Sequence, residues 1–198
     1  QNIRTLSEIG KEITSSLQLE RIQDVVYRHV HSMMDATSFL LMVYNEPERK
    51  LDCRMSMEKS APLPLFSVSM DEKNRFAVWC AEHRQPVVMN DVDTEYTRYT
   101  AVRAKPKAGE TVSSLIYLPL MVEDRLIGVI SVQSFQKNAY SPYHVDILTT
   151  LANYTAIALD NASAYEAIHR AHRELQAAQA QLGQAEKMAS LGQRTAGI

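Results

Sequence analysis

Two cysteines and six histidines are the side chains of this chain best suited to act as nucleophiles, redox groups or metal ligands. Cys53 and Cys80 form no C-x-x-C pair, and Arg54, the one cation beside either thiol, would point to the opposite face of a strand. We therefore expect two buried, unreactive thiols and no disulfide framework. The histidines show no metal-site spacing with carboxylates or cysteines; they are His29, His31, His83, His144, His169 and His172.

Other catalytic motifs are also missing from the sequence. There is no glycine-rich phosphate loop, nucleophile elbow or paired-carboxylate motif. We therefore predict no catalytic residue and no metal site in this chain, and thiol reduction is kept as the alternative from the enzyme class.

The charge balance of the 198 residues argues against a nucleic-acid partner. There are 21 Lys and Arg against 23 Asp and Glu, a net charge of -2, and nucleic-acid binding surfaces are usually strongly basic. The longest apolar runs, Leu115–Val122 and Leu126–Val132, fall short of the roughly 20 residues that span a bilayer. With few cysteines and no apolar leader, we expect a cytoplasmic fragment of a longer parent that could be membrane-associated.

Glycine and proline are distributed unevenly along the chain. None of the six Gly and seven Pro lies between Pro142 and Gly183. An uninterrupted stretch of this kind predicts one long helix. The pair Ser141-Pro142 is typical of a helix N-terminus. The serine side chain is expected there to accept a hydrogen bond from a free backbone amide of the first turn.

The preceding residues alternate between helical and strand patterns. Helices are predicted from apolar residues at steps of three and four, and strands from β-rich runs bounded by turn residues. The strands at 114–122 and 126–134 form the strongest hairpin, because both of their faces are mostly apolar. The other predicted elements are helices at 3–17, 22–34 and 76–84, strands at 38–44, 51–57, 65–69 and 86–91, and an irregular loop at 92–112.

This order of elements, with one sheet covered by helices, predicts an α+β fold. It resembles the GAF domain family, whose fold is related to PAS and has an antiparallel sheet flanked by helices. The resemblance covers roughly residues 5–165. It rests on Trp79–Val87, Asn90-Asp91-Val92, Ser114–Leu120, Ile127–Val132, Tyr140-Ser141-Pro142 and Leu148–Ala164.

The end of the chain carries a second resemblance. Residues Glu186–Ile198 are similar to the opening of the dimerisation and phosphotransfer domain of sensor histidine kinases, in which the phosphoacceptor histidine follows just after this stretch. The two resemblances together imply four segments. They are an N-terminal linker helix at 1–17, a GAF sensor domain at 18–165, a coiled-coil signalling helix at 166–185, and a truncated kinase dimerisation domain at 186–198.

The predicted signalling helix carries apolar residues at seven-residue intervals. Alternating a and d positions of a heptad form a seam that pairs with another helix. A monomer would expose this strip, so we predict a parallel homodimer with a weak, Ala-rich seam, and a helix folded back on its own domain is the alternative. The a row is Ile168, Leu175, Leu182 and Ala189, the d row is Ala171, Ala178 and Ala185, and Met188, Leu191, Thr195 and Ile198 continue at a shifted phase.

The GAF resemblance also implies a small-molecule pocket between the sheet and the layer made by the short helix and the irregular loop. Aromatic side chains with polar tips suit such a pocket. The ligand is unknown, because the sequence carries no signature for covalent bilin, haem or a metal. The residues predicted to line or gate the pocket are Trp79, Asp91, Tyr96, Tyr99, Ile116, Ser131 and Gln133.

The two resemblances imply the regulatory domain of a two-component sensor histidine kinase. Ligand binding would move the loop at 92–112 and the terminal helices, and so control autophosphorylation of a parent that acts on a response regulator. The fragment itself is not expected to be an enzyme. The alternatives are a ligand-free dimerisation module and the input domain of a cyclic-di-nucleotide synthase or a transcription regulator.

Overall fold

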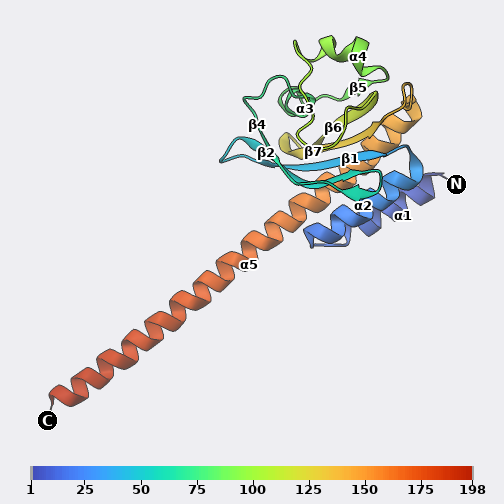
Figure 1. Ribbon diagram of the computed structural model, residues 1–198. Helices are drawn as coiled ribbons and strands as arrows, with labels where there is room; N and C mark the ends of the chain where they lie inside the picture. Colours follow the sequence, from blue (N-terminus) through green and yellow to red (C-terminus); the bar gives the residue numbers. More distant parts are fainter. Residues whose placement is uncertain (1, 198) are drawn as a thin grey trace. The chain divides into compact units, whose positions relative to one another are not determined.

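The computed structural model describes residues 2–197, which form one antiparallel sheet with helices on both faces (Figure 1). Gln1, Ile198 and the side chain of Ile3, all part of the predictions above, lie outside the described residues. The helices are α1 (Asn2–Thr14), α2 (Leu19–Met33), α3 (Phe76–His83), α4 (Val92–Glu95), the 3-10 helix η1 (Tyr96–Arg98) and α5 (Pro142–Ala196). The strands are β1 (Ser38–Asn45), β2 (Lys50–Glu58), β3 (Ala61–Pro62), β4 (Ser67–Ser69), β5 (Val87–Met89), β6 (Ser114–Val122) and β7 (Arg125–Ser134).

The sheet has the strand order β3-β2-β1-β7-β6-β5, and β4 also pairs with β2. All of its pairings are antiparallel. The predicted β6–β7 hairpin is confirmed, and the two strands predicted at 38–44 and 51–57 pair with each other as the hairpin β1–β2. The β6–β7 turn places Glu123 at a φ of 52°. At the centre of the sheet β7 runs beside β1, with Leu41 opposite Ile130.

One face of the sheet is covered by α1, α2 and the first part of α5 (Figure 1). Side chains alternate between the faces of a strand, so Ile116 and Ile130 point to this side, where they are fully buried. Gly10 of α1 lies so close to α5 that a Cβ added to it would be 2.4 Å from the Tyr154 ring. With Ile13 also fully buried, the predicted linker helix packs into the globular core.

The other face of the sheet is covered by α3, α4, η1 and the loop of residues 99–113, which we call the lid. The buried apolar side chains on this side form one cluster, which includes Leu115, Tyr117 and Val129 from the central hairpin. The short helices α4 and η1 occupy part of the stretch that we predicted to be irregular. They were missed because four and three residues are too few to show a helical period.

The long helix α5 begins at Pro142, as predicted. The cap differs from the expected one. Ser141 Oγ lies 3.2 Å from His144 Nδ1. The same ring nitrogen accepts a hydrogen bond from the backbone amide of Ser141 at 3.1 Å. The imidazole therefore satisfies the backbone amide of Ser141 itself rather than a free amide of the first helical turn.

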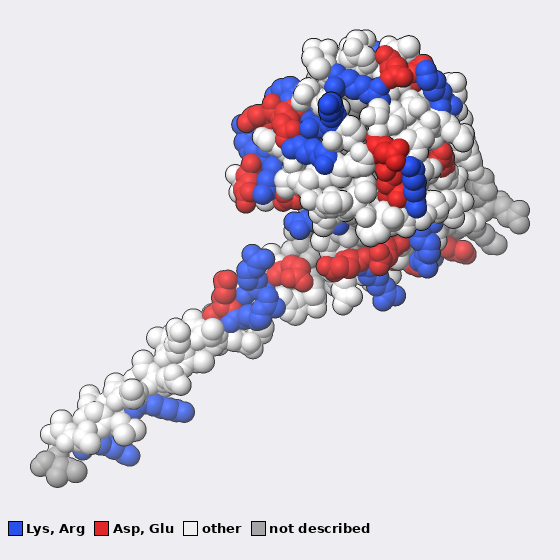
Figure 2. All heavy atoms as spheres, in the orientation of Figure 1, with Lys and Arg blue, Asp and Glu red and all other residues white. Residues whose placement is uncertain are grey.

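The chain divides into two compact units, of which the first ends at Asp160 and the second begins at Asn161. Up to Ala196 the second unit is the remainder of α5, and the large apolar side chains of this described part, among them Leu175 and Leu182, are exposed. No charged residue lies between Glu174 and Glu186, and uncharged side chains cover most of the visible face of this unit (Figure 2). Within residues 2–197, no helix combines the length and apolarity needed to cross a membrane.

Candidate functional site

Three buried polar side chains lie on the lid-covered face of the central hairpin. Gln133 Nε2 donates hydrogen bonds to Tyr117 Oη at 2.9 Å and to Ser131 Oγ at 3.1 Å. The register explains their meeting, because Tyr117 of β6 is directly opposite Ser131 of β7 and Gln133 follows on the same face. A buried polar group is costly unless it is hydrogen-bonded. We call these three residues the polar triad.

Burial controls the ionisation of the polar triad. It raises the pKa of Tyr117 to about 12, although hydrogen bonds with Ser131 and Gln133 oppose the shift. The phenol is therefore neutral at physiological pH and keeps its proton. A neutral phenol, hydroxyl and carboxamide can together bind an uncharged polar group through paired donors and acceptors.

Three of the aromatic residues predicted to line a pocket lie on the same side of the sheet as the triad. Trp79 and Tyr99 meet edge to face, with ring centroids 4.8 Å apart, and Trp79 also stacks on His83 at 4.2 Å. Tyr99 Oη donates to the Val88 carbonyl of β5 at 3.3 Å. Together with Tyr96, these rings are half-buried against the apolar cluster. The structure thus brings them together with Ser131 and Gln133.

The other two predicted residues lie elsewhere. Asp91 stands before the first residue of α4 and accepts a hydrogen bond from Lys137 Nζ at 2.8 Å. That lysine, more than any other neighbour, lowers the pKa of Asp91. Ile116 is fully buried on the helix-covered face, so it does not reach the side on which Ser131 lies.

The lid is fastened by a carboxylate that sequence reasoning missed. Glu72 accepts hydrogen bonds from Lys107 Nζ of the lid at 2.7 Å and from Arg75 Nε at 3.2 Å. Arg75 Nη1 also donates to the carbonyl of Lys105 at 2.5 Å. Burial alone would raise the pKa of Glu72, but these cations and the Ser69 amide outweigh it and lower the pKa. We call Glu72, Arg75 and Lys107 the latch.

Tyr117 could have been found from the sequence, whereas the latch could not. Once the hairpin is aligned, Tyr117 is the polar residue opposite Ser131, so the register contained the signal. Glu72 and Lys107 are 35 residues apart in the chain. No local pattern connects them.

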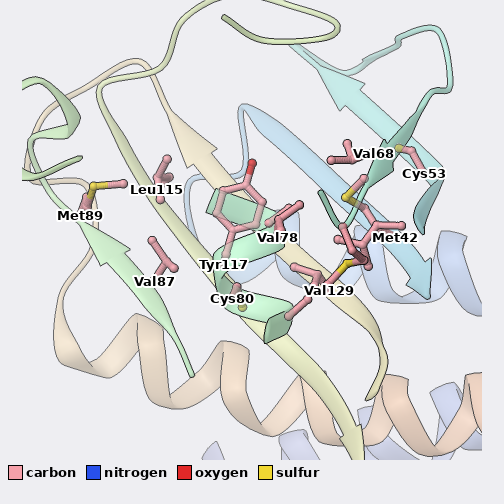
Figure 3. Close-up of a cluster of buried hydrophobic side chains, with 14 of the residues drawn as sticks. Met42, Cys53, Val68, Val78, Cys80, Val87, Met89, Leu115, Tyr117 and Val129 are labelled. Atoms are coloured by element: carbon pink, nitrogen blue, oxygen red, sulfur yellow. The ribbon is translucent and has the colours of Figure 1, made fainter. Parts of the chain in front are cut away.

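The two thiols are unsuited to nucleophilic chemistry. Both are free and buried, Cys53 on β2 and Cys80 on α3, and Figure 3 shows them at separate places in the apolar cluster. Burial raises the pKa of Cys53 to about 11 and raises that of Cys80 still further. Since the thiolate is the reactive species, both thiols are protonated and unreactive at neutral pH. Over residues 2–197, no group of three or more His, Cys, Asp or Glu is arranged to hold a metal ion.

A small open pocket lies on the opposite side of the sheet from the triad. It has a volume of about 180 Å³ and is formed by α1, α2 and the first turns of α5. The residues that line it are Thr5, Leu6, Met33, Tyr143 and Ile147. Its lining is mostly apolar, and none of the residues predicted to bind a ligand contributes to it.

The GAF domain family model matches residues 16–160 of this chain. Among curated proteins, the formate hydrogenlyase transcriptional activator FhlA of Escherichia coli is 22% identical over 175 residues, which are 88% of this chain and 25% of that protein. The corresponding activator of Salmonella typhimurium is 21% identical over the same share of each chain. The chain thus spans about a quarter of the length of the curated relatives it matches.

Solved structures with the same fold come from several classes of protein. The GAF domain of an Acinetobacter phosphoenolpyruvate-protein phosphotransferase has a TM-score of 0.67 and 20% identity, over 82% of this chain and 95% of that one. The GAF domain of a two-component sensor histidine kinase from Bacillus halodurans has a TM-score of 0.60 and 14% identity, over 76% and 99%. Free methionine-R-sulfoxide reductase from Neisseria meningitidis has a TM-score of 0.65 and 14% identity, over 81% and 89%. At these identities the likeness shows the fold alone.

Proposed function

Because the chain belongs to the GAF domain family, we propose that it is the sensing and dimerisation domain of a two-component sensor histidine kinase. The observation that carries the proposal is the exposed seam of α5, which leads into residues 186–198, the stretch similar to the opening of a kinase dimerisation domain. A GAF domain of a sensor histidine kinase is among the solved structures of the same fold. The full-length parent would then transfer phosphate to a response regulator.

The ligand would bind on the lid-covered face of the sheet. The polar triad supplies neutral donors and acceptors there, and Trp79, Tyr96 and Tyr99 supply aromatic walls. Trp79 and Tyr99 pack against each other, and both lie with Tyr96 against the apolar cluster that includes Tyr117. An entering molecule would therefore have to displace aromatic rings and loosen the lid. The latch is the contact that such a movement would break.

Hydrogen bonds around Asn90 connect the segment before α4 with the start of α5. Asn90 Nδ2 donates to the Tyr140 carbonyl at 2.8 Å, and the Tyr140 amide donates to Asn90 Oδ1 at 3.0 Å. Tyr140 Oη in turn donates to the carbonyl of Asp35, just after α2, at 2.7 Å. A movement of α4 and the lid would therefore reach α5 through Tyr140, two residues before that helix begins. A ligand would change the helix only through unequal affinity for its two arrangements.

The signalling role of the seam is tested by replacing Ala171, Ala178 and Ala185 with Leu in the full-length parent. Filling all three d positions should lock one helix packing, so autophosphorylation should lose its response to the stimulus. The control replaces Ala177 and Ala180, which lie outside the seam, with Leu. Autophosphorylation is measured by phosphate transfer from labelled ATP. An unchanged, responsive kinase would contradict the proposal.

Ligand binding is tested on the purified chain by native mass spectrometry and by a thermal-shift screen of small metabolites. A true ligand should raise the melting temperature of the wild type, and Tyr117→Phe should reduce that rise, because the variant lacks one hydrogen-bonding group of the triad. Tyr27→Phe, which removes a hydroxyl from α2 on the other face of the sheet, is the control. A stable dimer that no compound stabilises would favour a ligand-free dimerisation module.

The second candidate function is the input domain of a transcription regulator. It is favoured by the curated relatives, which are transcriptional activators and match over 88% of this chain. The two functions differ in the output of the parent, so an autophosphorylation assay and a promoter-reporter assay on the same parent separate them. A thiol reductase is disfavoured, because burial keeps both cysteines protonated.

A further inference from the structure

The heptad pattern of the seam continues in phase toward the N-terminus of α5. Counting back from Ile168 in alternating steps of four and three gives seven further a and d positions. They are Tyr143, Ile147, Thr150, Tyr154, Ile157, Asn161 and Ala164. The a and d face of α5 is therefore longer than the signalling helix that the sequence predicted.

The chain's own α1 covers the first part of this face. Tyr154 packs against Gly10, and Tyr143 and Ile147 line the small pocket together with residues of α1. α1 ends at Thr14, one turn after Gly10. Farther along the face, Ile157 is 43% exposed and Ile168 is 69% exposed. From Ile157 onward, another chain would have to bury the seam.

Asn161 is the first a position of the second unit, it is exposed, and it is the one asparagine in the exposed seam. We propose that Asn161 fixes the parallel, in-register pairing of α5 with α5 of a second copy of this chain. In that alignment the two carboxamides face each other and hydrogen-bond across the axis. A slip of seven residues places one Asn161 against Ile168 and the other against Tyr154. Neither carboxamide then faces its counterpart, and the one opposite Ile168 loses its hydrogen-bonding partner.

The rest of the seam cannot supply this specificity. Its a positions are Ile168, Leu175 and Leu182, and every d position from Ala164 to Ala185 is alanine. A slip of seven residues, or an antiparallel arrangement, would therefore bury nearly the same side chains. A regular seam of this kind leaves register weakly defined, and a single polar a residue is the best-attested device for defining it.

The flanking positions fit a second copy as the partner. In a parallel, in-register pair, each g residue lies near the e residue five positions later in the other helix. Glu174 then faces Gln179 of the second copy, and Gln181 faces Glu186. No like charges meet, and the uncharged stretch between the two acidic residues offers nothing to a strongly charged partner.

The inference rests on the proposed dimer and is tested by disulfide trapping in the complete chain. Cysteine is introduced at Ala171 in one sample and at Ala178 in another, with tags of different mass, and the two are mixed in a glutathione redox buffer. Because a disulfide needs Cα atoms within about 7 Å, 171–171 links report the proposed register and 171–178 links report a slip. The native Cys53 and Cys80 are buried, and the chain without added cysteine serves as the blank.

With Asn161 present, we expect 171–171 links to exceed 171–178 links about tenfold or more. Asn161→Leu should bring the two within about twofold while the dimer becomes tighter, because the polar residue specifies register at a cost in stability. Gln176→Leu, outside the seam, should leave the preference unchanged. An unchanged preference in Asn161→Leu would overturn the role of Asn161 but leave the dimer intact. A chain that sediments as a monomer would overturn the dimer as well.

Discussion

The two units of this chain differ in the burial of their large apolar side chains, although α5 contributes to both. In the first unit, Leu148 and Leu151 of α5 are completely buried. In the second unit, Leu175 is 56% exposed and Leu182 is 65% exposed. Burial of one leucine contributes about 1.5–3 kcal/mol, so the first unit obtains this stabilisation within the chain and the second leaves it unused.

The glycines show the same contrast between close packing and open space. A Cβ on Gly128 would be 2.0 Å from the backbone oxygen of Met42 on the neighbouring strand. A Cβ on Gly183 of the second unit would meet nothing within 4 Å. The first unit is therefore intolerant of added volume, whereas the second has room along its length for another chain.

The largest expected effect is that of Gly128→Ala. The new methyl group would collide with backbone rather than with a flexible side chain, so β1 and β7 would have to separate. We expect the free energy of unfolding to fall by about 3 kcal/mol. Urea unfolding followed by the fluorescence of Trp79, the one tryptophan, measures it. A fall in the free energy of unfolding of less than about 1 kcal/mol would show that β1 and β7 can separate at little cost, against the tight packing inferred for the first unit.

The next largest effect is expected for Leu175→Glu. The substitution places a charge at an a position of the proposed dimer, so the dissociation constant should rise by about thirtyfold, or about 2 kcal/mol. The urea transition of Trp79 should be unchanged, because this leucine contributes nothing to the first unit. Gln176→Glu is the control, and sedimentation equilibrium measures the association. If both variants dimerised equally well, the exposed seam would not be the dimer contact, and the difference drawn between the two units would be contradicted.

Much of the fold of the first unit could be predicted from the sequence, because its signals are local. The β6–β7 hairpin was confirmed with Arg125 as its only added residue, since two apolar runs flank a short polar turn. The start of α5 was found from Pro142. The short elements α4 and η1 were not found, and neither was the packing of α1, because Gly10 meets Tyr154 only in the folded chain.

The candidate site was harder to predict, because it is assembled across strands and loops. Of the residues predicted to line the pocket from the central strands, Ser131 and Gln133 lie on one face of β7, whereas alternation turns Ile116 to the other face. Tyr117 could have been found by aligning the predicted hairpin. The pairing of Glu72 with Lys107 depends on the path of the lid. That the assembled residues bind a ligand is still a prediction.

A smaller effect of opposite sign is expected for Gly183→Ala. Glycine within a helix is less favourable than alanine by about 1 kcal/mol, and the structure leaves the space beside Gly183 open. The helical circular dichroism of the second unit should therefore melt at a higher temperature, while the unfolding of the first unit monitored by Trp79 is unaffected. A destabilised helix would mean that something packs closely against Gly183, contrary to its open surroundings.

The smallest effect is expected at the latch, which holds an irregular loop through partly exposed ion pairs. Glu72→Gln should cost about 0.5 kcal/mol, because the ion pairs that it removes are partly exposed. The lid at residues 99–113 should exchange its amide hydrogens faster, as measured by mass spectrometry. Glu12→Gln, which removes an ion pair with Arg28 between α1 and α2 on the helix-covered face of the sheet, should leave lid exchange unchanged.

The latch also predicts a dependence of the lid on pH. The pKa of Glu72 is lowered in the folded chain from its ordinary value of 4.5, so its stabilisation is fully present above that value and is lost as the pH falls through the lowered pKa. Lid exchange, corrected for the intrinsic pH dependence of amide exchange, should therefore accelerate in acid in the wild type. Glu72→Gln should reduce that acceleration, because a carboxamide does not titrate in this range. Other carboxylate contacts of the lid remain in the variant, namely those of Glu58 with the Glu110 amide, of Glu110 with Lys59 and of Asp93 with Arg103. If the variant retained the full acceleration, those other carboxylates rather than Glu72 would account for the acid response of the lid.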